Sequence, residues 1–194
     1  IQLNYLDWTL QDAKAKYDLL TQRGIAVWVM EPVRGGKLVN LKDEDARKLK
    51  DLRPDESVAA WGFRFLQGLP NVKMILSGMS NMDQVTDNIK TFSNIAPLNE
   101  EETRVLLEVA ETMKGSIPCT ACRYCVDGCP AGIPIPDIFA LRNAQLGGEE
   151  VDAAAYSAFP TTAANCVDCG QCESACPQSL QIRDLLKEVD KAFS

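Results

Sequence analysis

The chain has eight cysteines, and all of them lie in two short runs. Each run has the spacing C-x2-C-x2-C-x3-C-P, in CTACRYCVDGCP (119–130) and in CVDCGQCESACP (166–177). The thiols are Cys119, Cys122, Cys125 and Cys129 in the first run, and Cys166, Cys169, Cys172 and Cys176 in the second. Three thiolates at this spacing surround three corners of a [4Fe-4S] cluster, and the fourth points toward a neighbouring cluster. The pattern predicts two clusters with crossed ligation, in which each run supplies three ligands to one cluster and one to the other.

Zinc and disulfides are the alternatives for these thiols. Zinc usually binds two C-x2-C pairs that are a dozen or more residues apart, and four thiols in one run with a trailing proline fit it poorly. Disulfides belong mainly to short secreted chains with dispersed cysteines, whereas clustered thiols indicate a metal site in a reducing compartment. Clusters with a purely structural role are a further alternative. Redox work is favoured because shared ligands place two clusters close together, as an electron relay requires.

The spacing resembles that of the bacterial two-cluster ferredoxins. Cys129 and Cys166 are separated by 36 residues, a longer spacer than in small ferredoxins, and we expect it to pack over the clusters or to face a partner. Residues 117–194 are expected to form a mostly α-helical domain of ferredoxin type. A linker at 97–116 precedes it, with a helix that begins at the N-cap Asn99, has Glu102 three residues later and ends at Gly115.

Residues 1–96 repeat one pattern three times: an apolar strand, a loop and an amphipathic helix. Continuous apolar strands joined by helical crossovers predict a parallel sheet that is covered on both faces, which is α/β architecture. The strands are expected at IQLNYL (1–6), IAVWVMEP (25–32) and VKMILSG (72–78), and the helices at 12–24, 55–68 and 81–92.

The charge of the chain excludes some classes of partner. Its formal net charge is −7 and its pI about 4.7, and no basic stripe is present to neutralise phosphates, which argues against nucleic acid and anionic membranes. No apolar run reaches the length of a transmembrane helix. We therefore expect a soluble protein in the cytoplasm.

Residues 1–96 resemble the C-terminal third of the aldo-keto reductases, which are (β/α)8 TIM barrels that use a nicotinamide cofactor. The resemblance is specifically to the branch with a C-terminal ferredoxin domain. IQLNYLDW is similar to the sixth strand of the barrel, VWVMEPVRGGKL to the seventh with its loop, and ILSGMSNMDQVTDNI to the eighth with its cofactor-binding turn. The resemblance implies a partial barrel of the last three β/α units, followed by the iron-sulfur domain.

The resemblance also implies residues that bind NAD(P). Gln2 corresponds to the residue that bonds the nicotinamide carboxamide, and Met30 to the ring that stacks on the nicotinamide. Glu31 falls where a small serine often approaches the pyrophosphate, and its carboxylate would repel the phosphates unless Arg34 or Lys37 offsets it. Gln84 stands where NADP-selective members have an arginine, so a 2′-phosphate would lack its bidentate partner. The other implied contacts are Ser77, Gly78, Met79 and Ser80 at the adenosine phosphate, and Asp87 and Asn88 near the adenine.

The chain has no histidine, whereas the family's catalytic Asp, Tyr, Lys and His lie on its early strands, so no catalytic residue is assigned. We expect part of a longer enzyme that exchanges hydride between a nicotinamide and a carbonyl or alcohol substrate, with two [4Fe-4S] clusters that pass electrons to a redox partner protein. This part alone is expected to be inactive and to self-associate through the open strand edge at 1–6. The alternative is an electron-transfer module in which the barrel portion is a docking scaffold.

Overall fold

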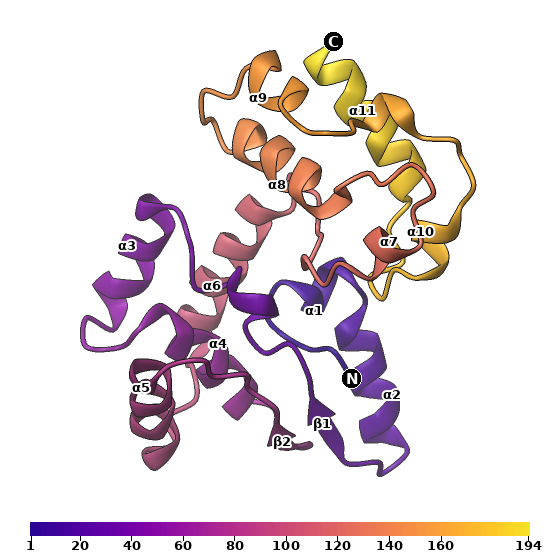
Figure 1. Cartoon of the computed structure of the whole chain (residues 1–194). Helices are drawn as coiled ribbons and strands as arrows, with labels where there is room; N and C mark the ends of the chain where they lie inside the picture. Colours follow the sequence, from indigo (N-terminus) through magenta and orange to yellow (C-terminus); the bar gives the residue numbers. More distant parts are fainter. The chain divides into compact units, whose positions relative to one another are not determined.

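The computed structural model describes all 194 residues, which form two compact units, Ile1–Met113 and Lys114–Ser194 (Figure 1). The chain is mostly helical, and its only sheet has two strands. No helix has the length and apolar character needed to cross a bilayer.

The first unit combines the two strands with seven helical segments. Its elements in chain order are α1 (Asp7–Leu10), α2 (Ala13–Gln22), β1 (Val27–Val29), η1 (Arg34–Gly36), α3 (Asp43–Leu52), α4 (Val58–Gln67), β2 (Val72–Ile75), α5 (Met82–Ser93) and α6 (Glu100–Met113). Helix α3 was not expected from the sequence, although three acidic residues in its first turn are typical of a helix N-terminus.

The sheet is smaller than the three strands that the sequence predicts. Strands β1 and β2 pair in parallel, as expected for strands joined by helices. The segment expected as the first strand forms only an isolated parallel bridge, between Gln2 and Met30. The side chain of Asn4 accepts hydrogen bonds from the backbone N–H groups of Leu6 and Asp7, and this local turn competes with extension of the strand. A partial TIM barrel is therefore not shown.

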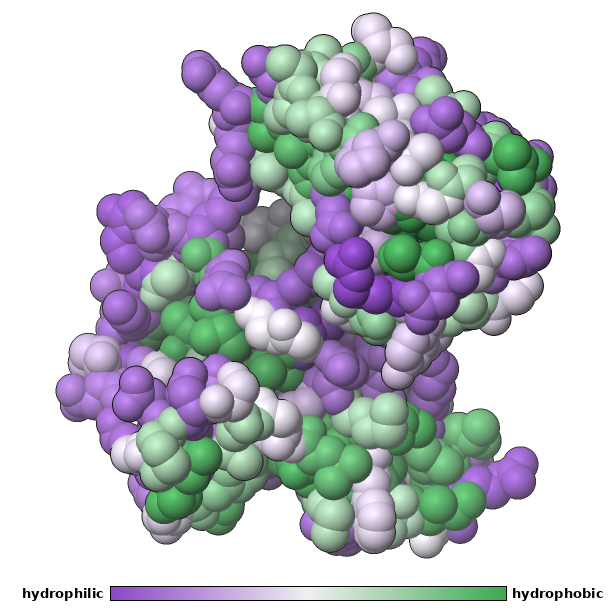
Figure 2. Space-filling view, viewed as in Figure 1, coloured by the Kyte–Doolittle hydropathy of each residue, from purple (hydrophilic) through white to green (hydrophobic).

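One face of the sheet is buried and the other is exposed, which corrects the expectation of two covered faces. Val27 and Val29 are buried in the core of the first unit, whereas Trp28 and Met74 are about half exposed. This alternation follows from the two-residue period of a strand. Apolar residues gather on the surface at the end of the first unit that carries β1 and β2 (Figure 2).

The linker helix α6 begins as the sequence predicts. Asn99 Oδ1 accepts from the N–H of Glu102, and Glu102 Oε2 accepts from the N–H of Asn99, which is a reciprocal capping box. Glu102 also receives two hydrogen bonds from Arg53, from Nε at 2.7 Å and from Nη2 at 2.6 Å. This ion pair ties α6 to the end of α3.

The second unit is built from short helices and loops around its own apolar core. Its elements are α7 (Tyr124–Asp127), α8 (Ile135–Leu146), α9 (Ala153–Ser157), η2 (Ala163–Asn165), α10 (Gln171–Ser174) and α11 (Ile182–Phe193). Helix α11 packs on α8, α10 and η2, and α7 packs on α10 (Figure 1). The core includes Cys125 and Cys172, together with Ile133, Ile138 and Leu186.

Candidate metal centre

The two cysteine runs have the same backbone structure. In the first run Ala121 and Arg123 have positive φ values of 56° and 66°, and in the second Asp168 and Gly170 have 58° and 78° at the equivalent positions. A four-residue helix follows in each run, α7 in the first and α10 in the second. Left-handed residues at these places turn the chain sharply, so that three cysteines close in sequence can face one space.

The equivalence continues after the fourth cysteine of each run. Gly132 and Ser179 both have positive φ, and their N–H groups donate to the carbonyls of Cys129 and Cys176 at 3.0 and 3.1 Å. The long helices α8 and α11 then begin at equivalent positions. Because α7 packs on α10, the two repeats face each other, and the fourth cysteine of each lies near the other run.

Burial follows the same order in both runs. The third cysteines, Cys125 and Cys172, are each 7% exposed. The second cysteines, Cys122 and Cys169, are exposed, and the first and fourth are partly buried. Each repeat thus holds one thiol in the apolar core and one at the surface, with the others between them.

One cavity collects thiols from both runs. Its lining includes Cys129 of the first run together with Cys166, Cys169 and Cys172 of the second. Its volume is about 20 Å³. This is the crossed ligand set that the sequence predicts for the second run.

The pKa of Cys125 gives evidence for the other ligand set, which joins the first three cysteines of the first run with Cys176. Burial, and after it the charges of Cys119, Cys122 and Cys176, raise the pKa of the Cys125 thiol to about 11. Cys176 of the second run is therefore close to the three leading cysteines of the first. Burial also raises the pKa of Cys172. Metal ligation requires the thiolate, so cluster binding must displace these protons.

The donors around the thiols fit an iron-sulfur cluster. The N–H of Ala121 donates to Cys119 Sγ and the N–H of Ile133 donates to Cys129 Sγ, each at 3.4 Å, and such bonds tune iron-sulfur sites. The cysteines form no disulfide. No group of three or more Cys, Asp or Glu side chains is arranged to hold a single metal ion.

Sequence reasoning missed Arg183, which also lines the cavity of Cys129. It lies on α11, and its contact with the cavity depends on how α11 packs against α10. No local sequence pattern predicts how these two helices pack.

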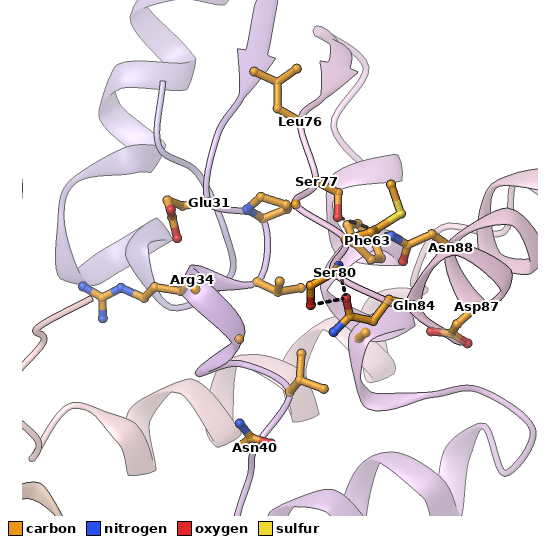
Figure 3. A pocket seen from close by; sticks show the side chains of 18 residues that line it. Glu31, Arg34, Asn40, Phe63, Leu76, Ser77, Ser80, Gln84, Asp87 and Asn88 are labelled. Atoms are coloured by element: carbon orange, nitrogen blue, oxygen red, sulfur yellow. Dashed lines mark hydrogen bonds between the residues drawn. The ribbon is translucent and has the colours of Figure 1, made fainter. Parts of the chain in front are cut away.

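A second cavity, of about 500 Å³, lies in the first unit (Figure 3). It is bounded by the loop after β1, by the segment 76–80 after β2 and by α4 and α5. Eight of the residues implied to bind NAD(P) line it: Arg34, Ser77, Gly78, Met79, Ser80, Gln84, Asp87 and Asn88. Gln2 and Met30 do not: Gln2 Nε2 donates to Asp7 Oδ2 at 2.7 Å, and Met30 is exposed.

Side chains on the β2 side of this cavity bond mainly to one another. Gln84 Oε1 accepts from the N–H and the hydroxyl of Ser80, at 2.7 and 3.3 Å (Figure 3). Asn88 Nδ2 donates to Ser77 Oγ at 3.3 Å, and Asp87 accepts from the Ser57 hydroxyl. The wall therefore presents amide, hydroxyl and carboxylate groups toward the space.

On the opposite side of the cavity, Arg34 pairs with a buried carboxylate. Arg34 is 1% exposed and its Nε lies 3.4 Å from Oδ1 of the buried Asp7. Its guanidinium points away from Ser77 and Asn88 (Figure 3). Glu31 Oε2 is buried without a hydrogen-bond partner, and the residue has a positive φ of 56°. Part of the charge of Arg34 is thus compensated by Asp7.

Comparison with known proteins identifies the second unit. Residues 118–180 match the family model described as a 4Fe-4S dicluster domain, and this segment contains all eight cysteines. The search of curated proteins and the search of solved structures gave no match. The expected resemblance of residues 1–96 to aldo-keto reductases finds no support in these comparisons. The second unit of the chain therefore contains a ferredoxin-type domain for [4Fe-4S] clusters.

Proposed function

We propose that the chain transfers electrons through two [4Fe-4S] clusters that are held by crossed ligation. The observation that carries this proposal is the cavity in which Cys129 of one run meets three cysteines of the other. Shared ligation brings two clusters close together, as in two-cluster ferredoxins. The proposed ligand sets are Cys119, Cys122, Cys125 and Cys176 for one cluster, and Cys129, Cys166, Cys169 and Cys172 for the other.

The residues around the thiols suit this role. Each bound cluster would accept and release one electron at a time. Ile133, Ile135 and Leu186 in the cavity wall are almost fully buried and limit the access of water. Cys122 and Cys169 are exposed, so we propose that a redox partner protein approaches at these thiols.

Iron and sulfide analysis of anaerobically reconstituted protein tests the proposal. We expect about eight iron and eight sulfide per chain, since each of two clusters holds four of each. After reduction with dithionite, the electron paramagnetic resonance spectrum should show coupling between two neighbouring spins. Protein that binds zinc without sulfide, or that holds a single cluster, would contradict the proposal.

We further propose that the first unit contributes to a nicotinamide site in an oxidoreductase of the aldo-keto reductase type, which acts on a carbonyl or alcohol substrate. Three separate segments implied to bind NAD(P) line one cavity of about 500 Å³, within the size range of small-molecule sites. The parallel pairing of β1 with β2 and the parallel bridge at Gln2 are compatible with part of a barrel. One feature argues against the site: the carboxylate of Glu31, whose Oε2 is buried without a hydrogen-bond partner, would repel a nucleotide phosphate bound beside it.

Binding of NADH and NADPH, measured by calorimetry, tests the nicotinamide site. Asn88→Ala should weaken binding about tenfold, which corresponds to about 1.4 kcal/mol. The matched control is Thr86→Ala, because Thr86 lies on the same helix, is exposed and does not line the cavity. The proposal fails if neither nucleotide binds, or if both variants weaken binding equally.

The second candidate is an electron-transfer module in which the first unit is a docking scaffold, and the match of residues 118–180 to a 4Fe-4S dicluster domain favours it. Cluster reduction distinguishes the two candidates. Reduction of the clusters by NADH or NADPH supports the oxidoreductase. Rapid reduction by an external ferredoxin, without reduction by either nucleotide, supports the module.

A further inference from the structure

Arg183 is held in a fixed position beside the cysteines of the second run. Its Nε donates to Glu173 Oε2 at 3.0 Å and its backbone N–H donates to Glu173 Oε1 at 3.0 Å. Nη1 lies 3.5 Å from Asp168 Oδ1. A Cβ on Gly170 would lie in ordinary van der Waals contact with this side chain, 3.8 Å from Arg183 Cζ. These contacts orient the side chain between α10 and α11.

The guanidinium lies on the side of this ion-pair group that faces the thiols. Arg183 lines the cavity of Cys129, Cys166, Cys169 and Cys172, whereas Glu173 and Asp168 are not part of its lining. The cation of the group therefore lines the cavity, whereas its two carboxylates do not. An additional electron makes a site with four thiolates more negative, and a cation in its wall stabilises that charge.

The first run has no counterpart of this group. In the repeat, Pro136 occupies the position of Arg183, Val126 that of Glu173 and Ala121 that of Asp168. Arg123 of the first run pairs with Asp137 at 3.0 Å, but both side chains are about half exposed, and solvent screens such a pair. Two sites with the same backbone structure thus differ in the cation beside them: Arg183 is 37% exposed and lines a cavity with four thiols, whereas Arg123 is 55% exposed.

We infer that Arg183 makes the two cluster sites electronically unequal, so that the site of Cys129, Cys166, Cys169 and Cys172 is reduced first. The inference rests on the proposed function, because it requires both clusters. Arg183 does not ligate the cluster; it acts through the electrostatic field of its positive charge at the cavity. Electrons then pass from the site completed by Cys176 to the site completed by Cys129.

Redox titration followed by electron paramagnetic resonance tests the role of Arg183. Two single-cluster backgrounds isolate the sites: Cys119→Ala with Cys176→Ala removes one ligand set, and Cys129→Ala with Cys166→Ala removes the other. Arg183→Gln should lower the equilibrium constant for reduction about tenfold, or the potential by about 59 mV for one electron. This shift should occur only in the Cys119→Ala/Cys176→Ala background, which keeps the cluster site beside Arg183. Arg183→Lys should retain most of the potential, since the positive charge remains.

Two further variants keep the test decisive. Glu173→Gln removes a compensating negative charge and should shift the same potential upward, opposite to Arg183→Gln. Arg123→Gln is the matched control, because it removes an exposed arginine of the first run, and its shift should be smaller in either background. An unchanged potential in Arg183→Gln, or equal shifts in both backgrounds, would overturn the inference. A protein that never holds two clusters would instead refute the proposed function.

Discussion

Crossed ligation makes a prediction that pairs of cysteine substitutions can test. If Cys129 and Cys166 bind the same cluster, replacing both with alanine destroys one cluster and leaves the other with four intact ligands. The chain should then retain about four of about eight iron atoms. If Cys129 and Cys119 bind different clusters, replacing both leaves each cluster with three ligands, and no intact four-ligand cluster remains.

The structure supports this assignment from two sides. Cys129 shares a cavity with Cys166, Cys169 and Cys172, and the charge of Cys176 acts on the pKa of Cys125. Uncrossed ligation would reverse the two outcomes, because Cys129 and Cys119 would then belong to one cluster and Cys129 and Cys166 to two. The two double variants are therefore controls for each other.

The assay is iron and sulfide content combined with electron paramagnetic resonance after anaerobic reconstitution. We expect the spectrum of one isolated four-iron cluster in Cys129→Ala/Cys166→Ala, without coupling to a second spin. In Cys129→Ala/Cys119→Ala we expect at most three-iron species or loss of both clusters. The opposite pattern, with the intact cluster in the second variant, would refute crossed ligation.

Three further predictions concern stability, loading and association. Glu102→Gln should lower the free energy of unfolding by about 2 kcal/mol, since Arg53 loses a charged partner. The hydrogen bonds from Arg53 lower the pKa of Glu102 below its ordinary 4.5. The stabilisation by this carboxylate is therefore present above that pH and is lost as the pH falls through the folded-state pKa. Denaturant melts between about pH 3 and about pH 7 should show the stability difference between the two proteins shrink as the pH falls, and a constant difference would contradict this. The affinity of the chain for its clusters should rise by at least about tenfold per pH unit as the pH rises toward the raised pKa of Cys125, since ligation releases thiol protons. An affinity that is independent of pH between about 6.5 and 8.5 would contradict this. The exposed face of β1 and β2 should make the chain self-associate. In light scattering, Trp28→Glu should shift the chain toward a monomer, while Met82→Glu, at an exposed position on α5, should not. A wild-type chain that is already a monomer would count against this.

Local sequence patterns predicted the parts of the fold that depend on near neighbours. The capping box of Asn99 and Glu102 forms as expected, because its hydrogen bonds join residues three apart. The parallel pairing of β1 with β2 joins residues far apart in the chain, and it was still predictable because strands joined by helical crossovers pair in parallel. The expected strand at 1–6 forms only a bridge at Gln2, because the side chain of Asn4 turns the backbone before a third strand develops.

The charges of the first unit could not be placed from the sequence. Arg34 or Lys37 was expected to offset Glu31, and no sequence pattern indicated that Arg34 pairs with Asp7, which is fully buried and lies in another segment of the chain. A buried carboxylate attracts whichever cation the fold brings to it, and proximity in sequence does not decide that.

The sequence by itself determined the chemistry of the second unit: eight thiols at ligand spacing, in two runs with the same pattern, require iron-sulfur clusters because three closely spaced thiolates fit one cubane. Only the tertiary structure decided how the two runs meet. The packing of α7 on α10 brings Cys129 to Cys166, Cys169 and Cys172, and the packing of α11 on α10 brings Arg183 to the same cavity. Cys129 is far from the second run in the chain, whereas Arg183 is close to it, but both contacts depend on how whole helices pack, so no short segment predicts them.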